Sequence, residues 1–300
     1  MSRTSDPREG FFTYVFLENN YRDWPWMALD GDWLIVSHHG NDDPAGPVSS
    51  LISLADMRVG RARPEYIHYF GTDLQGFNAE PPRQLGTLPS HSLLVGQDAT
   101  RMAFFALPHP VQPYGKKAAG WKFLNGTTYT DYVNEFLTYR KGMLYLAKQV
   151  EVSGKKEIRL IRLYLSLNGD EPVYSTAAGD GYKMWNMVGT TGQDLEAPIT
   201  AVNGAGEVFM VWSSHGRDPA DEIAPSVRHA IWRPAASWFD ATRTFRSGDG
   251  YASGTSESSI KARAAAVDPV DDRTFWAIHR YGTSAGNWGI VVGSVNPLDQ

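Results

Sequence analysis

The chain has 300 residues, 42% of them hydrophobic, with a formal net charge of −5 and no cysteine. Disulfides and thiolate metal sites are therefore excluded, and no apolar run reaches the roughly 18–20 residues that span a bilayer. Basic pairs such as Lys116-Lys117 are too short to suggest a nucleic-acid-binding patch. We expect a monomer of one domain, residues 1–300, with no nucleic-acid or membrane partner.

Five segments share one plan: a polar start, an apolar strand, a tight turn with Asp, Asn or Gly, a second apolar strand and a polar end. Asp-Gly and Asn-Gly turns tolerate the positive φ that tight hairpins require, so each segment predicts a β-hairpin. In chain order the predicted hairpins are Asp23–His39, His91–His109, Tyr132–Gln149, Glu196–His215 and Ile260–Arg280.

Further apolar runs between the hairpins predict third strands near residues 50–54, 158–165, 228–232 and 289–295. Phe11–Leu17 predicts a strand that closes the last repeat. Hairpins recurring at this spacing are typical of β-propellers. We therefore predict an all-β protein, a β-propeller of five four-stranded antiparallel blades around a central channel. A six-bladed propeller with a degenerate blade in residues 150–190 is the alternative, and a two-sheet sandwich would not explain the repeat.

The start of the first strand and the end of the second lie side by side in an antiparallel hairpin. In a propeller these hairpin mouths should open on one face. Six of the eight histidines stand there, and imidazole can act as acid, base or ligand near neutral pH. Polar residues are also ordinary where strands meet loops. The mouth residues are Arg22, Asp23, His91, Tyr132, Glu196 and Lys261 from first strands, and His38, His39, His109, Lys148, Gln149, His215, Arg217, His279 and Arg280 from second strands.

Three segments carry a family resemblance. The first is His91-Ser-Leu-Leu-Val-Gly-Gln-Asp, leading to Ala106-Leu-Pro-His109 and Tyr114; the second is Thr128-Tyr129-Thr130 followed by Tyr132; the third is Trp212-Ser-Ser-His215 with Arg217. They resemble the BNR-repeat (sialidase-like) β-propeller family, which includes ulvan-type and other uronate polysaccharide lyases and related glycosidases. The chain departs from that family at Lys148-Gln149 and at His215, where the family has arginine. The Ser-x-Asp-x-Gly-x-Thr-Trp box of sialidases is absent, which argues against sialidase activity.

The resemblance implies a carbohydrate-active enzyme whose partner is an oligo- or polysaccharide, with an anionic one fitting best. The main hypothesis is a polysaccharide lyase that performs β-elimination on a uronate-containing glycan. His91 and His109 would bind the carboxylate and transfer protons, and Tyr132 or Tyr129 would be the base or acid. The substrate-binding candidates are His38, His39, Tyr114, Lys148, His215, Arg217 and Arg280.

Two other functions stay open. A glycoside hydrolase would need paired carboxylates, for which Asp23, Glu135 and Glu196 are candidates. A non-catalytic carbohydrate- or protein-binding propeller is the other. We expect no cofactor; a divalent metal held by several mouth histidines is an alternative that no short-spaced ligand motif supports.

The first residues carry no apolar signal region. An extracellular or periplasmic location is expected if a signal peptide has been removed, and a cytoplasmic one otherwise.

Overall fold

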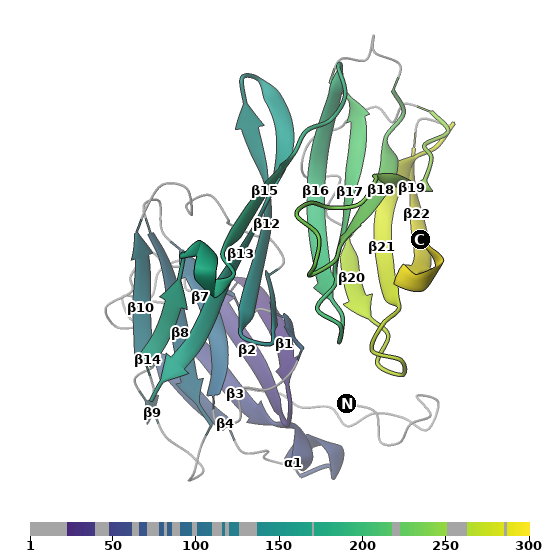
Figure 1. Cartoon of the computed structure of the whole chain (residues 1–300). Coiled ribbons are helices and arrows are strands. Elements are labelled where there is room, and N and C mark those ends of the chain that lie inside the picture. Colours follow the sequence, from purple (N-terminus) through teal and green to yellow (C-terminus); the bar gives the residue numbers. More distant parts are fainter. Residues whose placement is uncertain are drawn as a thin grey trace. The chain divides into compact units, whose positions relative to one another are not determined.

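The computed structural model describes residues 23–39, 48–61, 66–70, 78–80, 83–85, 91–97, 101–109, 116–117, 120–125, 137–169, 171–217, 223–250, 263–284 and 287–300. These residues form sheets that are antiparallel except where β4 (Tyr66–Phe70) pairs in parallel with β9 (Lys116–Lys117), and the short helix α1 (Leu54–Arg58) lies beside them (Figure 1). The prediction of an all-β protein is confirmed. In the described part of the chain, no helix is long and apolar enough to cross a membrane.

The chain divides into two compact units, both discontinuous in sequence. Unit 1 comprises Met1–Val133 and Leu165–Tyr174, and unit 2 comprises Asn134–Tyr164 and Ser175–Gln300. The chain thus leaves unit 1, enters unit 2, and returns to unit 1 for ten residues. The single domain expected from the sequence stays a prediction.

Unit 1 contains two sheets. The first has the strand order β1-β2-β3-β4-β9, and the second has the order β10-β8-β7-β5. The strands are β1 (Asp23–Asp30), β2 (Trp33–His39), β3 (Val48–Ser53), β4 (Tyr66–Phe70), β5 (Asn78–Glu80), β6 (Arg83–Leu85), β7 (His91–Gln97), β8 (Arg101–Pro108), β9 (Lys116–Lys117) and β10 (Gly120–Asn125).

Unit 2 contains the other three hairpins, each with at least one further strand. β11, β12 and β13 are neighbours, with β15 also paired to β13; β16-β17-β18-β19 form a second sheet and β20-β21-β22 a third. The long β13 continues into unit 1, where β14 lies beside its end. The strands are β11 (Leu137–Arg140), β12 (Met143–Val152), β13 (Lys155–Asn168), β14 (Glu171–Ser175), β15 (Lys183–Met187), β16 (Gln193–Val202), β17 (Val208–Gly216), β18 (Ser226–Trp232), β19 (Arg243–Arg246), β20 (Ala264–Val267), β21 (Phe275–Gly282) and β22 (Trp288–Val295).

All five predicted hairpins are present, as β1–β2, β7–β8, β11–β12, β16–β17 and β20–β21, and β3, β13, β18 and β22 are the predicted third strands. Apolar side chains from successive sheets of unit 2 pack together. Trp185 and Trp232 lie in one core cluster with ring centroids 5.3 Å apart, and Phe209 stacks on Phe275 at 5.1 Å in another. Buried aromatic pairs of this kind hold successive sheets face to face.

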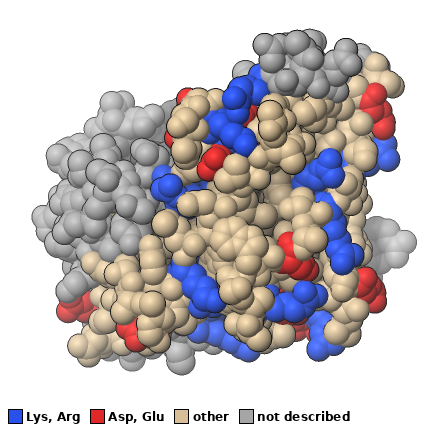
Figure 2. Space-filling model, turned by 45° about the horizontal axis from the view of Figure 1, so that its top comes forward, with Lys and Arg blue, Asp and Glu red and all other residues tan. Residues whose placement is uncertain are grey.

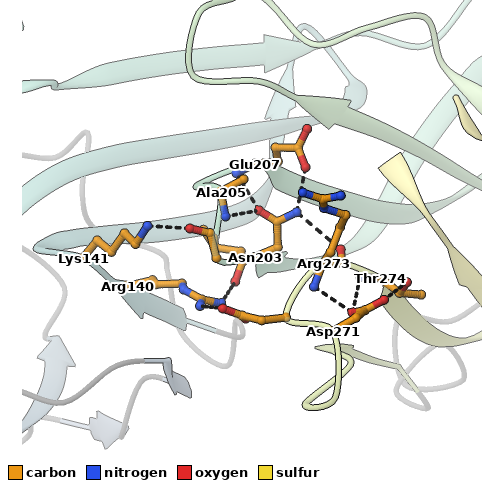
Figure 3. Close-up of polar contacts among 11 residues, drawn as sticks. Arg140, Lys141, Asn203, Ala205, Glu207, Asp271, Arg273 and Thr274 are labelled. Carbon is orange, nitrogen blue, oxygen red and sulfur yellow. Dashed lines mark hydrogen bonds and ion pairs between the residues drawn. The ribbon is translucent and has the colours of Figure 1, made fainter. Parts of the chain in front are cut away.

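Polar contacts tie the turns of the three unit 2 hairpins together (Figure 3). Arg140 donates to the carbonyl of Val202 at 2.9 Å and to the Asp272 carboxylate at 2.5 Å. The amide of Gly204 donates to the Asp272 carbonyl at 2.9 Å. The turns of β11–β12, β16–β17 and β20–β21 therefore lie at the same end, and these hairpins point the same way, as the sequence predicts.

The first two hairpins do not follow that rule. Asp30, at the turn of β1–β2, accepts a 2.7 Å hydrogen bond from Ser92 Oγ at the mouth of β7–β8. Trp33, across the same turn, lies 5.7 Å from the ring of His109. The prediction that all five mouths open on one face is wrong here, because the turn of the first hairpin lies at the mouth of the second, where Ser92 stabilises a carboxylate that is 1% exposed.

The predicted closing strand at Phe11–Leu17 lies outside the described residues. The number of blades and the closure of a ring accordingly stay predictions.

Candidate active site

Two acidic side chains mark the mouth of β16–β17. Asp194 and Glu196 are two residues apart on β16, and side chains at that spacing point to the same side of a strand. In the strand register Asp194 lies opposite His215, and Glu196 lies opposite Ser213 on β17. The local geometry of one hairpin thus gathers two carboxylates and an imidazole.

Glu196 is almost fully buried, with 1% of its surface exposed. Its Oε2 lies 3.1 Å from Nε2 of His215, and its Oε1 contacts the ammonium group of Lys156. Burial alone would raise the pKa of Glu196, but the contacts with His215 and Lys156 outweigh it and hold the pKa below the ordinary carboxyl value. Glu196 is therefore ionised near neutral pH.

His215 is the proton-bearing partner of this pair. Its Nδ1 lies 2.8 Å from the carbonyl of Gly216, so Nδ1 carries a hydrogen that it donates. Burial lowers the pKa of His215, but the contact with the Glu196 carboxylate more than compensates and the pKa is raised. Nε2 faces Glu196, and the ring therefore binds a second proton more readily than an ordinary histidine does.

Asp194 is held by two donors. Its Oδ1 accepts from the backbone amide of Lys156 at 3.1 Å and lies 3.3 Å from Nε of Arg217. The side chains of Lys156 and Arg217 are 30% and 43% exposed, whereas those of Asp194 and Glu196 are 8% and 1% exposed. The solvent-accessible part of this site is cationic, and its carboxylates are buried.

Lys156 enters the site through a tight turn. Ser153 and Gly154 both have positive φ, 52° and 72°, and they close the β12–β13 hairpin just before Lys156. A two-residue turn of this kind places the first residues of β13 beside the mouth of β16–β17. The backbone amide of Lys156 then donates to Asp194, and its side-chain ammonium group donates to Glu196.

Three of the predicted mouth residues are brought together here: Glu196, His215 and Arg217. Asp194 and Lys156 were missed. The alternation of acidic residues along β16 was a signal for Asp194, and the Ser-Gly turn was a weak one for Lys156.

The other predicted site residues lie elsewhere or outside the described side chains. His91, opposite Pro108, and His109, whose Nε2 lies 3.0 Å from Ser92 Oγ, stand at the mouth of β7–β8 in unit 1. Lys148 is buried on β12, and Arg280 is half-buried on β21. The side chains of Asp23, His38 and His39 and the residues Tyr114, Tyr129, Tyr132 and Glu135 are outside the described part. The catalytic and binding roles of all of these stay predictions.

The distribution of charged side chains and of possible metal ligands bears on the predictions from the sequence. On the face that Figure 2 shows, Lys and Arg lie in separate groups with Asp and Glu among them. Among the described residues, no three His, Asp or Glu side chains gather in a way that would hold a metal ion.

No protein-family model matches the sequence, and no curated protein matches it closely. Among solved structures, a thermostable family-43 glycoside hydrolase aligns with a TM-score of 0.41 and 11% identity, over 90% of this chain and 88% of that chain. An endo-arabinase from Bacteroides thetaiotaomicron VPI-5482 aligns with a TM-score of 0.27 and 14% identity, over 91% of this chain and 93% of that chain. Scores and identities this low assign neither a fold nor an activity to this chain.

Proposed function

We propose that the protein is a carbohydrate-active enzyme of the glycoside hydrolase class, with its reaction centre at Asp194, Glu196 and His215. One observation carries the proposal. Two buried carboxylates stand two residues apart at a hairpin mouth, and an imidazole whose pKa is raised lies against one of them. Glycoside hydrolysis needs one group that gives a proton to the leaving oxygen and a second that acts as base or nucleophile.

The spacing of the two acidic residues suits that chemistry. A β-strand rises about 3.3 Å per residue, so the Cα atoms of Asp194 and Glu196 are about 6–7 Å apart. The paired carboxyl groups of glycosidases are separated by about 5–10 Å. Side chains projecting in the same direction from these positions fall within that range.

The environments of the two carboxylates support different roles. Oε2 of Glu196 and Nε2 of His215 lie 3.1 Å apart, and we assign proton donation to this pair. Asp194, which is held by Arg217 and by the Lys156 amide, is the base that activates water. The exposed cations Lys156 and Arg217 would bind hydroxyl or carboxylate groups of the glycan.

The fold in this proposal is the predicted β-propeller. This prediction is supported by three consecutive hairpins of unit 2, which point the same way and are each followed by a third strand. The opposite placement of the first two hairpins is a departure that a five-bladed ring would have to accommodate.

The lyase hypothesis has less support. Its acid and base, Tyr129 and Tyr132, lie outside the described residues, while the groups gathered at the described site are carboxylates. A lyase and a hydrolase both create new reducing ends, but only elimination leaves an unsaturated product that absorbs ultraviolet light.

The test uses the full chain with a panel of neutral and uronate-containing polysaccharides, assayed for reducing ends and for ultraviolet absorbance. We expect reducing ends without absorbance, and their loss in Glu196→Gln and in Asp194→Asn. Asp249→Asn is the matched control, since Asp249 is half exposed and pairs only with Arg246 among the contacts described. Ultraviolet-absorbing product would overturn the hydrolase assignment in favour of a lyase, and binding without turnover would overturn enzymatic function.

A further inference from the structure

A buried histidine outside the proposed reaction centre contacts the backbone beside Glu196. His279 lies on β21, in the sheet that follows β16–β19 in the chain, and none of its surface is exposed. Its Nε2 lies 3.1 Å from the carbonyl of Ala197, the residue directly after Glu196. Its Nδ1 lies 3.3 Å from Oγ of Ser213, the residue opposite Glu196 in the strand register.

The contacts of the ring define its tautomer. Nε2 faces the Ala197 carbonyl, which can only accept, whereas Nδ1 lies 3.0 Å from the amide and 3.3 Å from the carbonyl of Arg280, so in the neutral ring Nδ1 accepts from the amide. The hydrogen is on Nε2 and is donated to the Ala197 carbonyl. Burial lowers the pKa of His279 to about 4, so the ring stays neutral in this tautomer at neutral pH.

Ala197 occupies a strained point of the strand. The register of β16 with β17 shifts between Glu196 and Ile199, and Ala197 has φ 54°. Residues other than glycine are uncommon in this left-handed region, and such strain persists only where neighbouring groups fix it. The next residue, Pro198, has no amide hydrogen, so the bulge breaks no hydrogen bond from its backbone nitrogen. Bulges of this kind change the direction of the side chain beside them.

These observations connect His279 to the direction of the Glu196 side chain. We propose that His279 is a positioning residue, which holds the bulge at Ala197 and the facing Ser213 so that Glu196 points at His215. It touches no reacting atom itself. The inference rests on the proposed hydrolase function only in its activity readout, since the contact between Glu196 and His215 can be measured without turnover.

Two amide substitutions separate the positioning contact from a general need for a buried polar group. In His279→Gln the amide nitrogen reaches the place of Nε2 and can still donate to Ala197. In His279→Asn the amide nitrogen lies at the place of Nδ1 and cannot reach the Ala197 carbonyl. His229→Asn is the matched control, because His229 is also buried in unit 2 but contacts Phe209, Phe245 and Gln300 instead.

The readout is the pKa of His215, measured by NMR on histidine-labelled full-length chain, with its signal assigned from its absence in His215→Gln. We expect the raised pKa to persist in H279Q and H229N and to fall toward the ordinary value of 6.5 in H279N. In the glycan assay kcat should fall about tenfold or more in H279N with KM unchanged. H279Q should restore most of kcat.

An unchanged pKa of His215 in folded H279N would overturn the proposal, as would an equal fall in H229N. If H279N does not fold, Ser213→Ala takes its place, because it removes the hydroxyl contact of the same ring. In Ser213→Ala we then expect the pKa of His215 to fall by less than is expected for H279N. A His215 pKa equal to that of the wild type overturns the proposal. If the hydrolase assignment fails instead, E196Q and wild type will be equally inactive while the pKa of His215 still responds to H279N.

Discussion

Nε2 of His215 lies 3.1 Å from Oε2 of Glu196, and each group shifts the other's pKa toward its charged form. The Glu196 carboxyl has a lowered pKa, so its contribution to stability is present above pH 4.5 and is lost as the pH falls through that lowered value. The His215 pKa is raised, so its contribution is present below pH 6.5 and is lost as the pH rises through the raised value. The pair stabilises unit 2 most between these two limits.

Breaking this pair should be costly. Glu196→Gln leaves the His215 imidazolium and the Lys156 ammonium beside a neutral amide, and removing one partner of a buried ion pair costs about 3–5 kcal/mol. We expect a loss of that size in urea unfolding at pH 6, together with a fall in the pKa of His215. Asp249→Asn, which breaks an exposed pair with Arg246, should cost less than about 1 kcal/mol. Equal losses in the two variants would contradict the burial argument.

Acid should weaken the fold through His279. Its pKa in the folded chain is about 4, against an ordinary value of 6.5, so the unfolded chain binds the proton first as the pH falls. The difference corresponds to about 3 kcal/mol of unfolding free energy lost by pH 4. His279→Gln removes this titration. We expect its unfolding free energy to fall by less than that of the wild type between pH 7 and pH 4, as measured by urea unfolding at both pH values.

The turn contacts of Arg140 offer a test of the hairpin arrangement in unit 2. Arg140→Gln removes its bonds to the Val202 carbonyl and the Asp272 carboxylate (Figure 3), and should cost about 1–3 kcal/mol. The exposed Arg243 is the control, and Arg243→Gln should change stability by less than about 0.5 kcal/mol. If Arg140→Gln leaves the unfolding free energy unchanged, the three turns are not held together by this side chain.

Close backbone packing at Gly282 gives a steric test. A Cβ on Gly282 would lie 2.4 Å from the carbonyl oxygen of Gly250 and 2.9 Å from Cδ of Pro225. Backbone atoms and a proline ring cannot move aside cheaply, so Gly282→Ala should cost about 1–3 kcal/mol in thermal unfolding. At Gly179 a Cβ would meet nothing within 4 Å, and Gly179→Ala should be nearly neutral. Similar melting temperatures for the two variants would contradict this packing.

The hairpins could be predicted because their determinants are local. Turn residues such as Asp30-Gly31 and Asn203-Gly204, flanked by apolar strands, define a hairpin without reference to the rest of the chain. The same locality explains why Glu196 and His215 were predicted to be close, since they end two strands of one hairpin. The contact of Lys156 with Glu196 depends on how the β12–β13 hairpin lies against β16, forty residues away in sequence, and no local pattern predicts it.

The arrangement of the first two hairpins shows the same limit. Repetition of a motif suggests equivalent placement, and in unit 2 that inference is correct. In unit 1 the turn of the first hairpin meets the mouth of the second through a hydrogen bond between Asp30 and Ser92, 62 residues apart in sequence. A contact between residues this far apart in sequence leaves no signal in the hydrophobic pattern.

The return of the chain to unit 1 at Leu165–Tyr174 limits how the protein can be divided and how it is made. A cut after Val133 yields a first fragment without β14 and a second fragment that carries a strand belonging to the other unit. During synthesis, unit 1 cannot be completed until residue 174 has left the ribosome, by which time β11, β12 and the unit 2 part of β13 have also been made. Dissection of this protein into independently folding halves therefore requires that Leu165–Tyr174 be grafted onto the first fragment, because the four segments alternate between the units and no single cut separates them.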